Sequence, residues 1–197
     1  MSEERFPEEP FDEAGFSHGD AGPEGELPLP PPEALQKWLA ERGSEPENAA
    51  PRKLYEKEVK VVAVYEQVTI SGQKMYFVLL RDNHNREIRI YVGAPEAMSI
   101  SMVAEGQAFS RPLTHDLMKL IVDRTGWKVD RVTIDDLYNE TFYAKLTLTH
   151  NGTTIDIDCR PSDAIALAMR AKAPIYVAED VITSASKADE DSDTRPE

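Results

Sequence analysis

Two short segments of the sequence combine titratable side chains with the beginning of a predicted helix. The first, RPLTHDL at residues 111–117, brings a histidine and an aspartate together shortly after a proline. The dipole of a helix disfavours a cation in its first turn, so a histidine there stays neutral and can accept a proton. His115 is therefore a candidate general base or acid, and Asp116 lies beside it in the same turn.

The second segment, IDIDCRPSDAIALAMR at residues 155–170, could hold a phosphate or a metal ion. Strand alternation places Asp158 and Arg160 on one face, and Asp163 follows in the first turn of the next helix. An arginine can hold a phosphate through two parallel hydrogen bonds. A divalent metal, Mg²⁺ or Mn²⁺, needs only one or two carboxylates besides phosphate oxygens, so Asp158, Asp163 and the earlier Glu96 are candidate ligands.

Both segments also have a purely structural interpretation. Thr114 and Asp116 can simply cap a helix, and the Pro-Ser-Asp sequence at 161–163 is an ordinary helix beginning. Cys159 is predicted to be a small core residue rather than a nucleophile, because alternation places it on the apolar face of its strand. The residue types alone leave the catalytic and the structural interpretations open.

Hydrophobic periodicity predicts the elements that must position these residues. Strands are predicted near residues 59–70, 75–80, 88–92, 129–137, 142–149 and 153–159. Helices are predicted after Pro95, over residues 113–126, and after Pro161. In the second helix, Leu113, Leu117 and Ile121 are predicted to form the buried stripe, with His115, Asp116, Lys119 and Asp123 facing elsewhere.

The predicted elements repeat, with three strands and two helices followed by three strands and at least one helix. When the sequence is shifted by 67 positions without a gap, seven of about thirty positions are identical, against roughly two expected from average composition. Identical pairs include Ile88 with Ile155 and Ala97 with Ala164. The pattern predicts an α+β fold of duplicated β3-α2 units around a single curved, barrel-like and mostly antiparallel sheet.

Charge and proline content divide the chain into a core domain and two flanks. The formal net charge is -14, of which residues 1–56 carry -9 and also nine of the fourteen prolines. Such a segment buries too little apolar surface to fold, so 1–56 is predicted to be a disordered acidic tail with a short helix near 33–42. A second disordered acidic tail is predicted at 183–197, which leaves 57–182 as the domain.

Several classes of protein are excluded by composition. The longest unbroken apolar runs, at residues 75–80 and 164–169, have six residues each and are too short for a transmembrane helix, and the acidic N-terminus lacks the apolar region of a secretory signal. A single cysteine allows no internal disulfide and no cysteine-based zinc site. We therefore expect a cytoplasmic protein without a membrane partner. Glycine-rich phosphate loops and the common protease, esterase and kinase motifs are also missing from the sequence.

RPLTHDL followed some forty residues later by RPSDAIALAMR resembles the bifunctional nuclease domain family. The resemblance extends over about residues 58–182 and includes IRIYVGAPEAMSISM and TFYAKLTL, although Cys159 replaces an expected alanine. It implies a fold of two β3-α2 repeats around a barrel-like sheet, and it implies hydrolysis of phosphodiester bonds in both DNA and RNA. The positions matching the signature segments are Gly93, Glu96, Ala97, Arg111, Pro112, Leu113, Thr114, His115, Asp116, Asp158, Arg160, Pro161, Ser162, Asp163 and Ala164.

Two hypotheses follow for the function. The first is a nuclease acting on DNA and RNA with a divalent metal, in which His115 activates water or protonates the leaving oxygen and arginines stabilise the phosphorane charge. Its candidate residues are His115, Asp116, Asp163 and Arg160 for catalysis, Arg111, Thr114 and Ser162 for substrate binding, and Asp158, Asp163 and Glu96 for the metal. The second is a non-catalytic, homo-oligomeric regulatory module that binds nucleic acid or another ligand at the same residues. A homo-oligomer is expected under either hypothesis.

Overall fold

The structure, a computed structural model, describes residues 55–107 and 109–185. The predicted tail at 1–56, with its short helix near 33–42, lies outside the described residues except for its last two positions. The predicted tail at 183–197 lies outside them except for its first three positions. Residue 56 belongs to the first strand, and residues 183–185 end a helical stretch that begins at residue 179.

The first half of the domain is an antiparallel meander followed by a helix. Strands β1 (Glu56–Val68), β2 (Lys74–Asp82) and β3 (Glu87–Val92) pair in sequence order. Gly72, with a positive φ of 82°, allows the first reversal, and Asn85, with a φ of 62°, allows the second. Helix α2 (Ala94–Ala104) then begins with a proline in its first turn, where no backbone N–H is required.

The second half contains the same kinds of element. Helix α3 (Thr114–Arg124) precedes strands β4 (Lys128–Tyr138), β5 (Thr141–His150) and β6 (Thr153–Cys159), which again form an antiparallel meander. Two-residue turns at 139–140 and 151–152 have positive φ at both positions, the geometry that suits the twist of a hairpin. Helix α4 (Pro161–Ala171) follows β6 directly.

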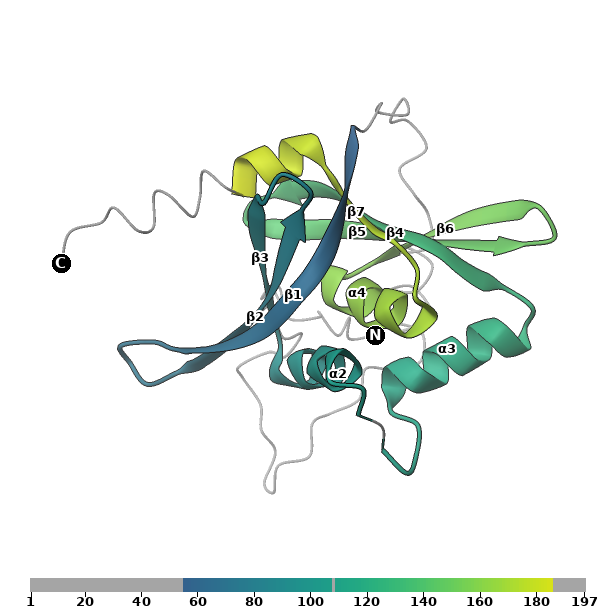
Figure 1. Ribbon diagram of the computed structural model, residues 1–197, viewed down its shortest axis with the longest axis horizontal. Coiled ribbons are helices and arrows are strands. Elements are labelled where there is room, and N and C mark those ends of the chain that lie inside the picture. The colour runs from purple at the N-terminus through teal and green to yellow at the C-terminus, as the bar shows by residue number, and fades with distance from the viewer. Residues whose placement is uncertain (1–54, 108, 186–197) are drawn as a thin grey trace, which may run out of the picture. The chain divides into compact units, whose positions relative to one another are not determined.

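A short final strand, β7 (Ile175–Ala178), joins the two halves (Figure 1). It pairs antiparallel with β1 and parallel with β4, which gives one sheet in the order β3-β2-β1-β7-β4-β5-β6. The predicted α+β class and the mostly antiparallel sheet are confirmed. The sheet is not closed, because β3 and β6 lie at its edges, so barrel-like closure is not confirmed and the duplication stays a prediction.

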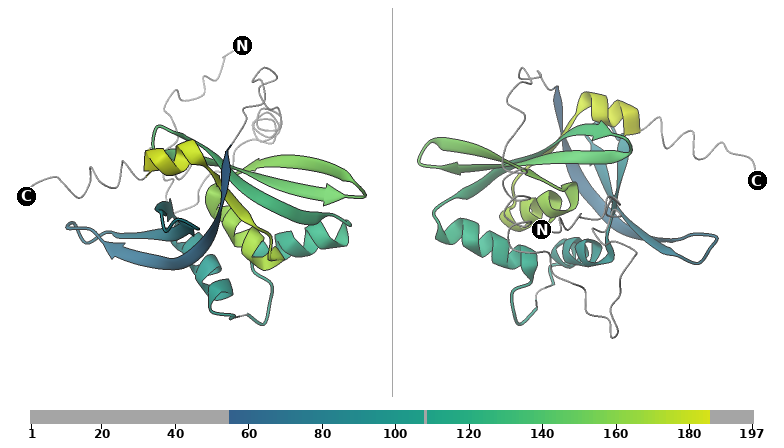
Figure 2. Two further views of the ribbon diagram at one scale, coloured as in Figure 1. Left: turned by 45° about the horizontal axis from the view of Figure 1, so that its top comes forward. Right: turned by 180° about the vertical axis from the view of Figure 1, so that it is seen from behind.

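Helix α4 is the centre of the helical layer. It contacts α2, α3 and strands β3, β4 and β5, and its residues 164–168 are all buried. The three helices gather on one face of the curved sheet (Figure 2). The core is formed by the apolar residues that alternate into this space, with the largest fully buried side chains being Leu80, Ile88, Ile100, Ile134, Ile165, Leu167, Ile182, Val78, Val132 and Val177.

The predicted orientation of α3 is wrong. Leu117 and Ile121, expected to be buried, are 53% and 54% exposed, whereas His115 is only 7% exposed. Polar contacts of His115 and Asp116 hold the beginning of the helix against α4, and Val122 packs against the core, while Leu117 and Ile121 face outward. Periodicity identifies which side chains share a helical face, but a polar partner on the neighbouring helix decided which face turns inward.

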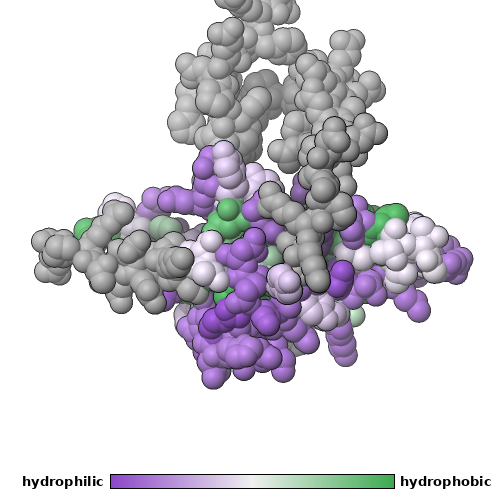
Figure 3. Space-filling model, turned by 90° about the horizontal axis from the view of Figure 1, so that it is seen from above, coloured by the Kyte–Doolittle hydropathy of each residue, from purple (hydrophilic) through white to green (hydrophobic). Residues whose placement is uncertain are grey.

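The outer surface of the domain is mainly hydrophilic in the view of Figure 3, where apolar side chains gather only in separate patches. Within the described ranges, no helix is both long enough and apolar enough to cross a membrane.

Candidate functional site

The two signature segments meet on the helical layer, where α2 contributes further side chains. His115 lies in the first turn of α3, Asp163 in the first turn of α4, and Arg160 is the N-cap residue of α4. Glu96 lies in the first turn of α2, one turn before Ser99. Residues that are 48 and 64 positions apart in the chain therefore share one hydrogen-bonded cluster.

His115 is held on both sides of its ring. Its Nδ1 lies 2.9 Å from Ser99 Oγ, and its Nε2 lies 3.2 Å from Asp163 Oδ1. An ionised carboxylate can only accept, so we assign the ring proton to Nε2, which leaves Nδ1 to accept from the Ser99 hydroxyl. Ser99 is 5% exposed, so this side of the ring is shielded from solvent, and Asp163 forms its outward side.

Arg160 covers the outward side of Asp163. Its Nε donates to Asp163 Oδ2 at 2.8 Å, and its Nη2 donates to Asp163 Oδ1 at 3.0 Å and to Glu96 Oε1 at 2.9 Å. The Arg160 side chain is 66% exposed, while those of Asp163 and Glu96 are 24% and 17% exposed. The cluster therefore presents a guanidinium to solvent, with two carboxylates behind it and an imidazole deeper still.

The charges in the cluster stabilise one another. Burial opposes ionisation of Asp163, but hydrogen bonds from His115 and Arg160 outweigh it and hold the pKa of this carboxyl below its ordinary value. The hydrogen bond to Asp163 raises the pKa of Arg160 against the opposing effect of burial. Asp163 is thus an anion at neutral pH and Arg160 a cation, and the exposed guanidinium is paired with the carboxylates of Asp163 and Glu96.

Gly93 leaves room for the Glu96 carboxylate. A Cβ atom at residue 93 would lie 2.4 Å from Glu96 Oε2, closer than a real contact allows. The backbone at Gly93 has an ordinary φ of -70°, so what glycine provides here is space for the Glu96 carboxylate rather than a special turn. A side chain at residue 93 would displace Glu96 and with it one partner of Arg160.

Asp116 faces a different partner. Its Oδ1 accepts from Arg170 Nε at 2.6 Å, and its Oδ2 accepts from the Leu113 backbone N–H at 2.9 Å. These hydrogen bonds, that from Arg170 being the stronger, lower the pKa of Asp116. Arg170 Nη1 also donates to the carbonyl oxygens of Ser99 and Ala166, so the Asp116–Arg170 pair ties α3, α2 and α4 together.

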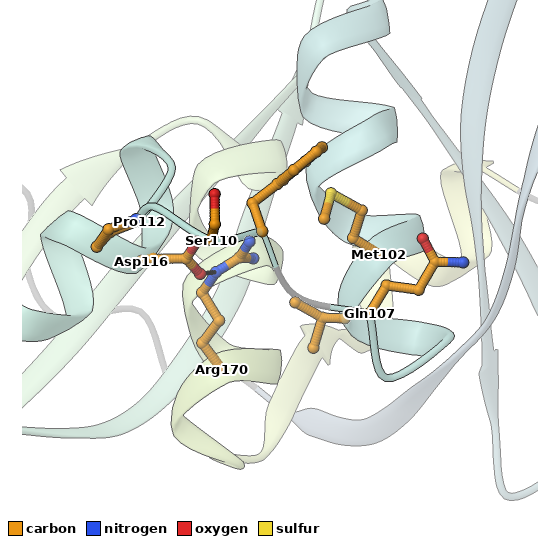
Figure 4. Close-up of a pocket in the computed structure, with 8 residues that line it drawn as sticks. Met102, Gln107, Ser110, Pro112, Asp116 and Arg170 are labelled. Atoms are coloured by element: carbon orange, nitrogen blue, oxygen red, sulfur yellow. Dashed lines mark hydrogen bonds and ion pairs between the residues drawn. The ribbon is translucent and has the colours of Figure 1, made fainter.

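A pocket of about 320 Å³ lies beside the Asp116–Arg170 pair (Figure 4). In Figure 4 the carboxylate of Asp116 and the guanidinium of Arg170 meet at one side of the pocket, with Met102 and Gln107 across from them. The lining residues are Met102, Val103, Gln107, Phe109, Ser110, Pro112, Asp116 and Arg170. Asp116 therefore belongs to this pocket and not to the cluster around His115.

The remaining predicted residues lie around the cluster. Arg111 and Thr114 are exposed at the entry to α3, and Ser162 is buried at the beginning of α4. Asp158 lies on the exposed strand β6, opposite Lys145 of β5. The structure therefore brings His115, Asp163, Arg160 and Glu96 together in one hydrogen-bonded cluster. The other predicted residues lie outside the hydrogen bonds of this cluster, namely Asp116, Asp158, Arg111, Thr114 and Ser162.

The predicted metal ligands do not form a metal site. Over residues 55–107 and 109–185, no group of three or more His, Cys, Asp or Glu side chains is arranged to hold a metal ion. Arg160 also bridges Glu96 and Asp163, so a guanidinium occupies the place that a cation would take between these carboxylates. The donor set does not fit a preformed divalent metal site.

Cys159 has the surroundings of a structural residue. It packs against the core cluster, and its Sγ lies 3.6 Å from the Ala144 carbonyl oxygen, to which the thiol donates. Burial, helped by the negative charges of Asp158 and Asp163, raises the pKa of the thiol to about 12. A thiol with this pKa is protonated at neutral pH and is a poor nucleophile.

Two polar residues of the site were not among the sequence-based candidates, namely Ser99 and Arg170. Arg170 is seven residues, or two helical turns, after Asp163 and therefore lies on the same face of α4, which the spacing alone could have indicated. Ser99 stands in an apolar stretch of α2, and only the three-dimensional contact with His115 distinguishes it from an ordinary helical serine.

Comparison with known proteins gives one family. The model of the bifunctional nuclease domain matches residues 78–190. The protein named Rv1829 of Mycobacterium tuberculosis, described as uncharacterized, is 38% identical over 129 residues, which are 65% of this chain and 75% of the relative. Bifunctional nuclease 1 of Oryza sativa subsp. indica and Bifunctional nuclease 2 of subsp. japonica are 30% and 32% identical over 105 residues, 51% of this chain and 32% of each relative.

Proposed function

Because the chain belongs to the bifunctional nuclease domain family, we propose that it is a nuclease that hydrolyses phosphodiester bonds of DNA and RNA. The proposal is carried by the cluster in which Arg160 faces solvent and the buried His115 supports Asp163 from behind. The whole plant relatives are about three times as long as the part they share with this chain, so their names support the class of reaction and not its details.

Arg160 is the proposed phosphate-binding residue. A guanidinium binds phosphate oxygens in the same two-pronged geometry in which it now binds Asp163. When a phosphodiester arrives, Arg160 exchanges part of its contact with Asp163 and Glu96 for contact with the phosphate. The positive charge then lies where negative charge develops in the transition state. Arg111, Thr114 and Ser162 are proposed to contact the flanking parts of the substrate.

Asp163 and His115 are the proposed proton-handling pair. Once Arg160 turns to the phosphate, Asp163 Oδ2 is released and can accept a proton from an attacking water molecule, whose oxygen forms the new P–O bond. The P–O bond to the leaving oxygen breaks, and this oxygen takes a proton from solvent. His115 fixes the carboxylate through Nε2 and is in turn fixed by Ser99 through Nδ1. In this scheme the imidazole acts through the carboxylate, because Ser99 and Asp163 already occupy both of its nitrogens. Asp116 supports α3 through Arg170.

A cleavage assay with single- and double-stranded DNA and RNA tests the proposal. Each substrate is incubated with Mg²⁺, Mn²⁺ or EDTA, which also tests the expected divalent metal. His115→Ala, Asp163→Asn and Arg160→Ala should each lower the rate at least about 100-fold while the proteins remain folded by circular dichroism. Asp158→Asn, outside the cluster, is the matched control and should cleave at the wild-type rate.

Each result of the assay has a defined meaning. Loss of activity in the three cluster variants but not in Asp158→Asn supports the proposed site. Equal activity in all proteins contradicts it, since that pattern indicates a contaminating nuclease or another site. Binding without any cleavage supports the alternative function, a non-catalytic module that binds nucleic acid at the same cluster.

We also propose that the chain forms a homo-oligomer through α3. Leu117, Met118, Leu120 and Ile121 are 37–54% exposed on one side of this helix, opposite the side held by His115. A second copy of the chain fits this surface, because a twofold axis places the same apolar stripe on both partners. This proposal is shared by the nuclease and the non-catalytic alternative.

A further inference from the structure

Three aromatic rings form a continuous row across the first three strands. Tyr65 of β1 is the register partner of Phe77 of β2, which is the partner of Tyr91 of β3. The ring centroids of Tyr65 and Phe77 are 5.2 Å apart in a stacked arrangement, and those of Phe77 and Tyr91 are 5.7 Å apart and tilted. We call these three residues the aromatic row.

The row lies on the face of the sheet that points away from the core. Val78 and Ile90, neighbours of Phe77 and Tyr91 in the sequence, are 0% and 2% exposed, so strand alternation turns the rings to the other side. Tyr65 and Tyr91 are 43% and 51% exposed. None of the three side chains contributes to the hydrophobic core cluster.

Both ends of the row are open. Tyr91 belongs to β3, which is an edge strand. On the other side, β7 pairs with β1 only over Glu56–Val59, so among the described strands nothing pairs with β1 beside Tyr65. The hairpin of β1 and β2 accordingly extends beyond the rest of the sheet (Figure 1). A flat ring can therefore stack onto either end of the row and extend it.

A positive charge lies next to the row. The Arg89 guanidinium is 5.8 Å from the centroid of the Phe77 ring, in the position of a cation–π contact. Arg89 and Tyr91 are two positions apart in β3 and therefore lie on the same face of the strand. The surface thus combines stacking rings with a guanidinium, which are the two groups that bind the bases and the phosphates of a single strand.

We propose that the aromatic row binds unpaired bases of a single-stranded polynucleotide, and that the strand then passes around the edge strand β3 to the cluster around Asp163 on the helical side of the sheet. The proposal rests on the nucleic acid substrate proposed above. Glu96 is five positions after Tyr91, so at most about 17 Å of chain joins the row to the cluster. A duplex does not bind this way, because its bases are already stacked and paired.

Fluorescence anisotropy with labelled 15-nucleotide single-stranded DNA and RNA, in EDTA to prevent cleavage, tests the proposal. The double variant Tyr65→Leu/Tyr91→Leu should bind both strands at least about tenfold more weakly, since stacking on each ring is lost. Tyr65→Phe/Tyr91→Phe retains the rings and should bind within twofold of the wild type. Tyr143→Leu, an equally exposed tyrosine on β5, is the matched control and should be unchanged.

The result separates this proposal from the proposed nuclease activity. Binding that depends on the rings, with no cleavage by the wild type, leaves the row as a binding surface and contradicts the nuclease. If the folded leucine variant binds as tightly as the wild type, the proposed role of the aromatic row is overturned, whether or not the wild type cleaves. An equal loss of affinity for a 15-base-pair duplex also overturns it, because the row is then not selective for unpaired bases.

Discussion

Ser99 gives His115 a single orientation, although its hydroxyl does not reach solvent. It is 5% exposed, and its Oγ is the only hydrogen-bond partner of His115 Nδ1 within the described residues. A buried ring nitrogen that loses its partner keeps its desolvation cost, which is typically about 1–3 kcal/mol. The serine is therefore a positioning residue for the proposed proton-handling pair.

Ser99→Ala should lower the kcat of nucleic acid cleavage at least about tenfold and leave KM nearly unchanged, because the substrate does not contact Ser99. The free energy of unfolding should also fall, by about 1–3 kcal/mol. Ser99→Thr retains the hydroxyl and should restore most of the kcat. If Ser99→Ala and Ser99→Thr have the same kcat, the hydrogen bond to His115 has no role in the reaction.

The two aspartates at the helix beginnings make stability depend on pH in the acid range. The pKa of Asp163 and that of Asp116 are below the ordinary value of 3.8 in the folded protein. The folded state therefore binds fewer protons than the unfolded state, so the stabilisation is fully present above the ordinary pKa and is lost as the pH falls below it.

Urea unfolding between pH 6 and pH 2 should show this loss beginning near pH 4. In the double variant Asp116→Asn/Asp163→Asn, the free energy of unfolding should be lower than that of the wild type at pH 6. It should also fall less steeply between pH 4 and pH 2, because neither asparagine can ionise. A double variant whose stability falls as steeply as that of the wild type would show that other carboxyl groups control acid unfolding.

At the level of the elements, a buried carboxylate organises the turn between β2 and β3. The side chain of Asp82 is fully buried and accepts hydrogen bonds from the backbone N–H groups of His84 and Arg86 and from Arg86 Nε. Arg86 also pairs with Glu179, at the beginning of the final helical stretch. The turn is thereby fastened to the C-terminal part of the described domain.

Asp82→Ala should lower the thermal midpoint by at least about 5 °C, because three donors lose a fully buried acceptor at once. Arg81→Ala is the control on the same hairpin. It breaks the ion pair with Glu87, whose two side chains are both 42% exposed, and exposed pairs contribute little. Differential scanning calorimetry on both variants compares the two effects, and equal shifts would contradict the role given to Asp82.

Helix α3 shows why the elements were easier to predict than their orientation. Strands β1–β6 were found from alternation and α2–α4 from their prolines and periodicity, because these signals lie within a few residues of one another. His115 was identified as a candidate by its place in the helix, but its burial depends on Ser99 and Asp163, which are distant in sequence. β7 was missed because four residues carry too little pattern.

The outward stripe of α3 predicts the state of association. The wild type should elute as a dimer or larger species in size-exclusion chromatography with light scattering, and Leu117→Lys/Ile121→Lys should give the 22.1 kDa monomer. Charges at these positions are tolerated in a monomer, because both side chains are more than half exposed. Tyr138→Lys, at an exposed site on β4, should not change the mass. A wild type that is monomeric at 100 µM would contradict the proposal.

On the scale of the whole molecule, β7 is the only strand among those described that joins the two meanders. Its four residues pair with Glu56–Val59 on one side and with Val132–Ile134 on the other. Ile175, Val177 and Ala178 are at most 6% exposed, so the strand also completes the core.

Ending the chain after Pro174 should therefore abolish the cooperative unfolding transition, since β1 and β4 lose their shared neighbour and the core loses its final residues. Ending it after Ala185 removes only residues 186–197, which belong to the segment 183–197 predicted from sequence to be a solvated tail, and the thermal midpoint should stay within about 2 °C of the full chain. Near-ultraviolet circular dichroism during heating distinguishes the two. A cooperative transition in the shorter protein would show that each meander folds without β7.

The position of β7 near the end of the sequence also affects how the protein is made. Residues 56–59 leave the ribosome long before residues 175–178, so β1 has an unpaired edge for most of the time the chain is being translated. Contacts between such distant residues slow folding. During synthesis this edge is open to pairing with a neighbouring polypeptide, in addition to the edges of β3 and β6 that stay unpaired in the folded sheet, and a chaperone that covers exposed strands would be useful to the protein at this stage.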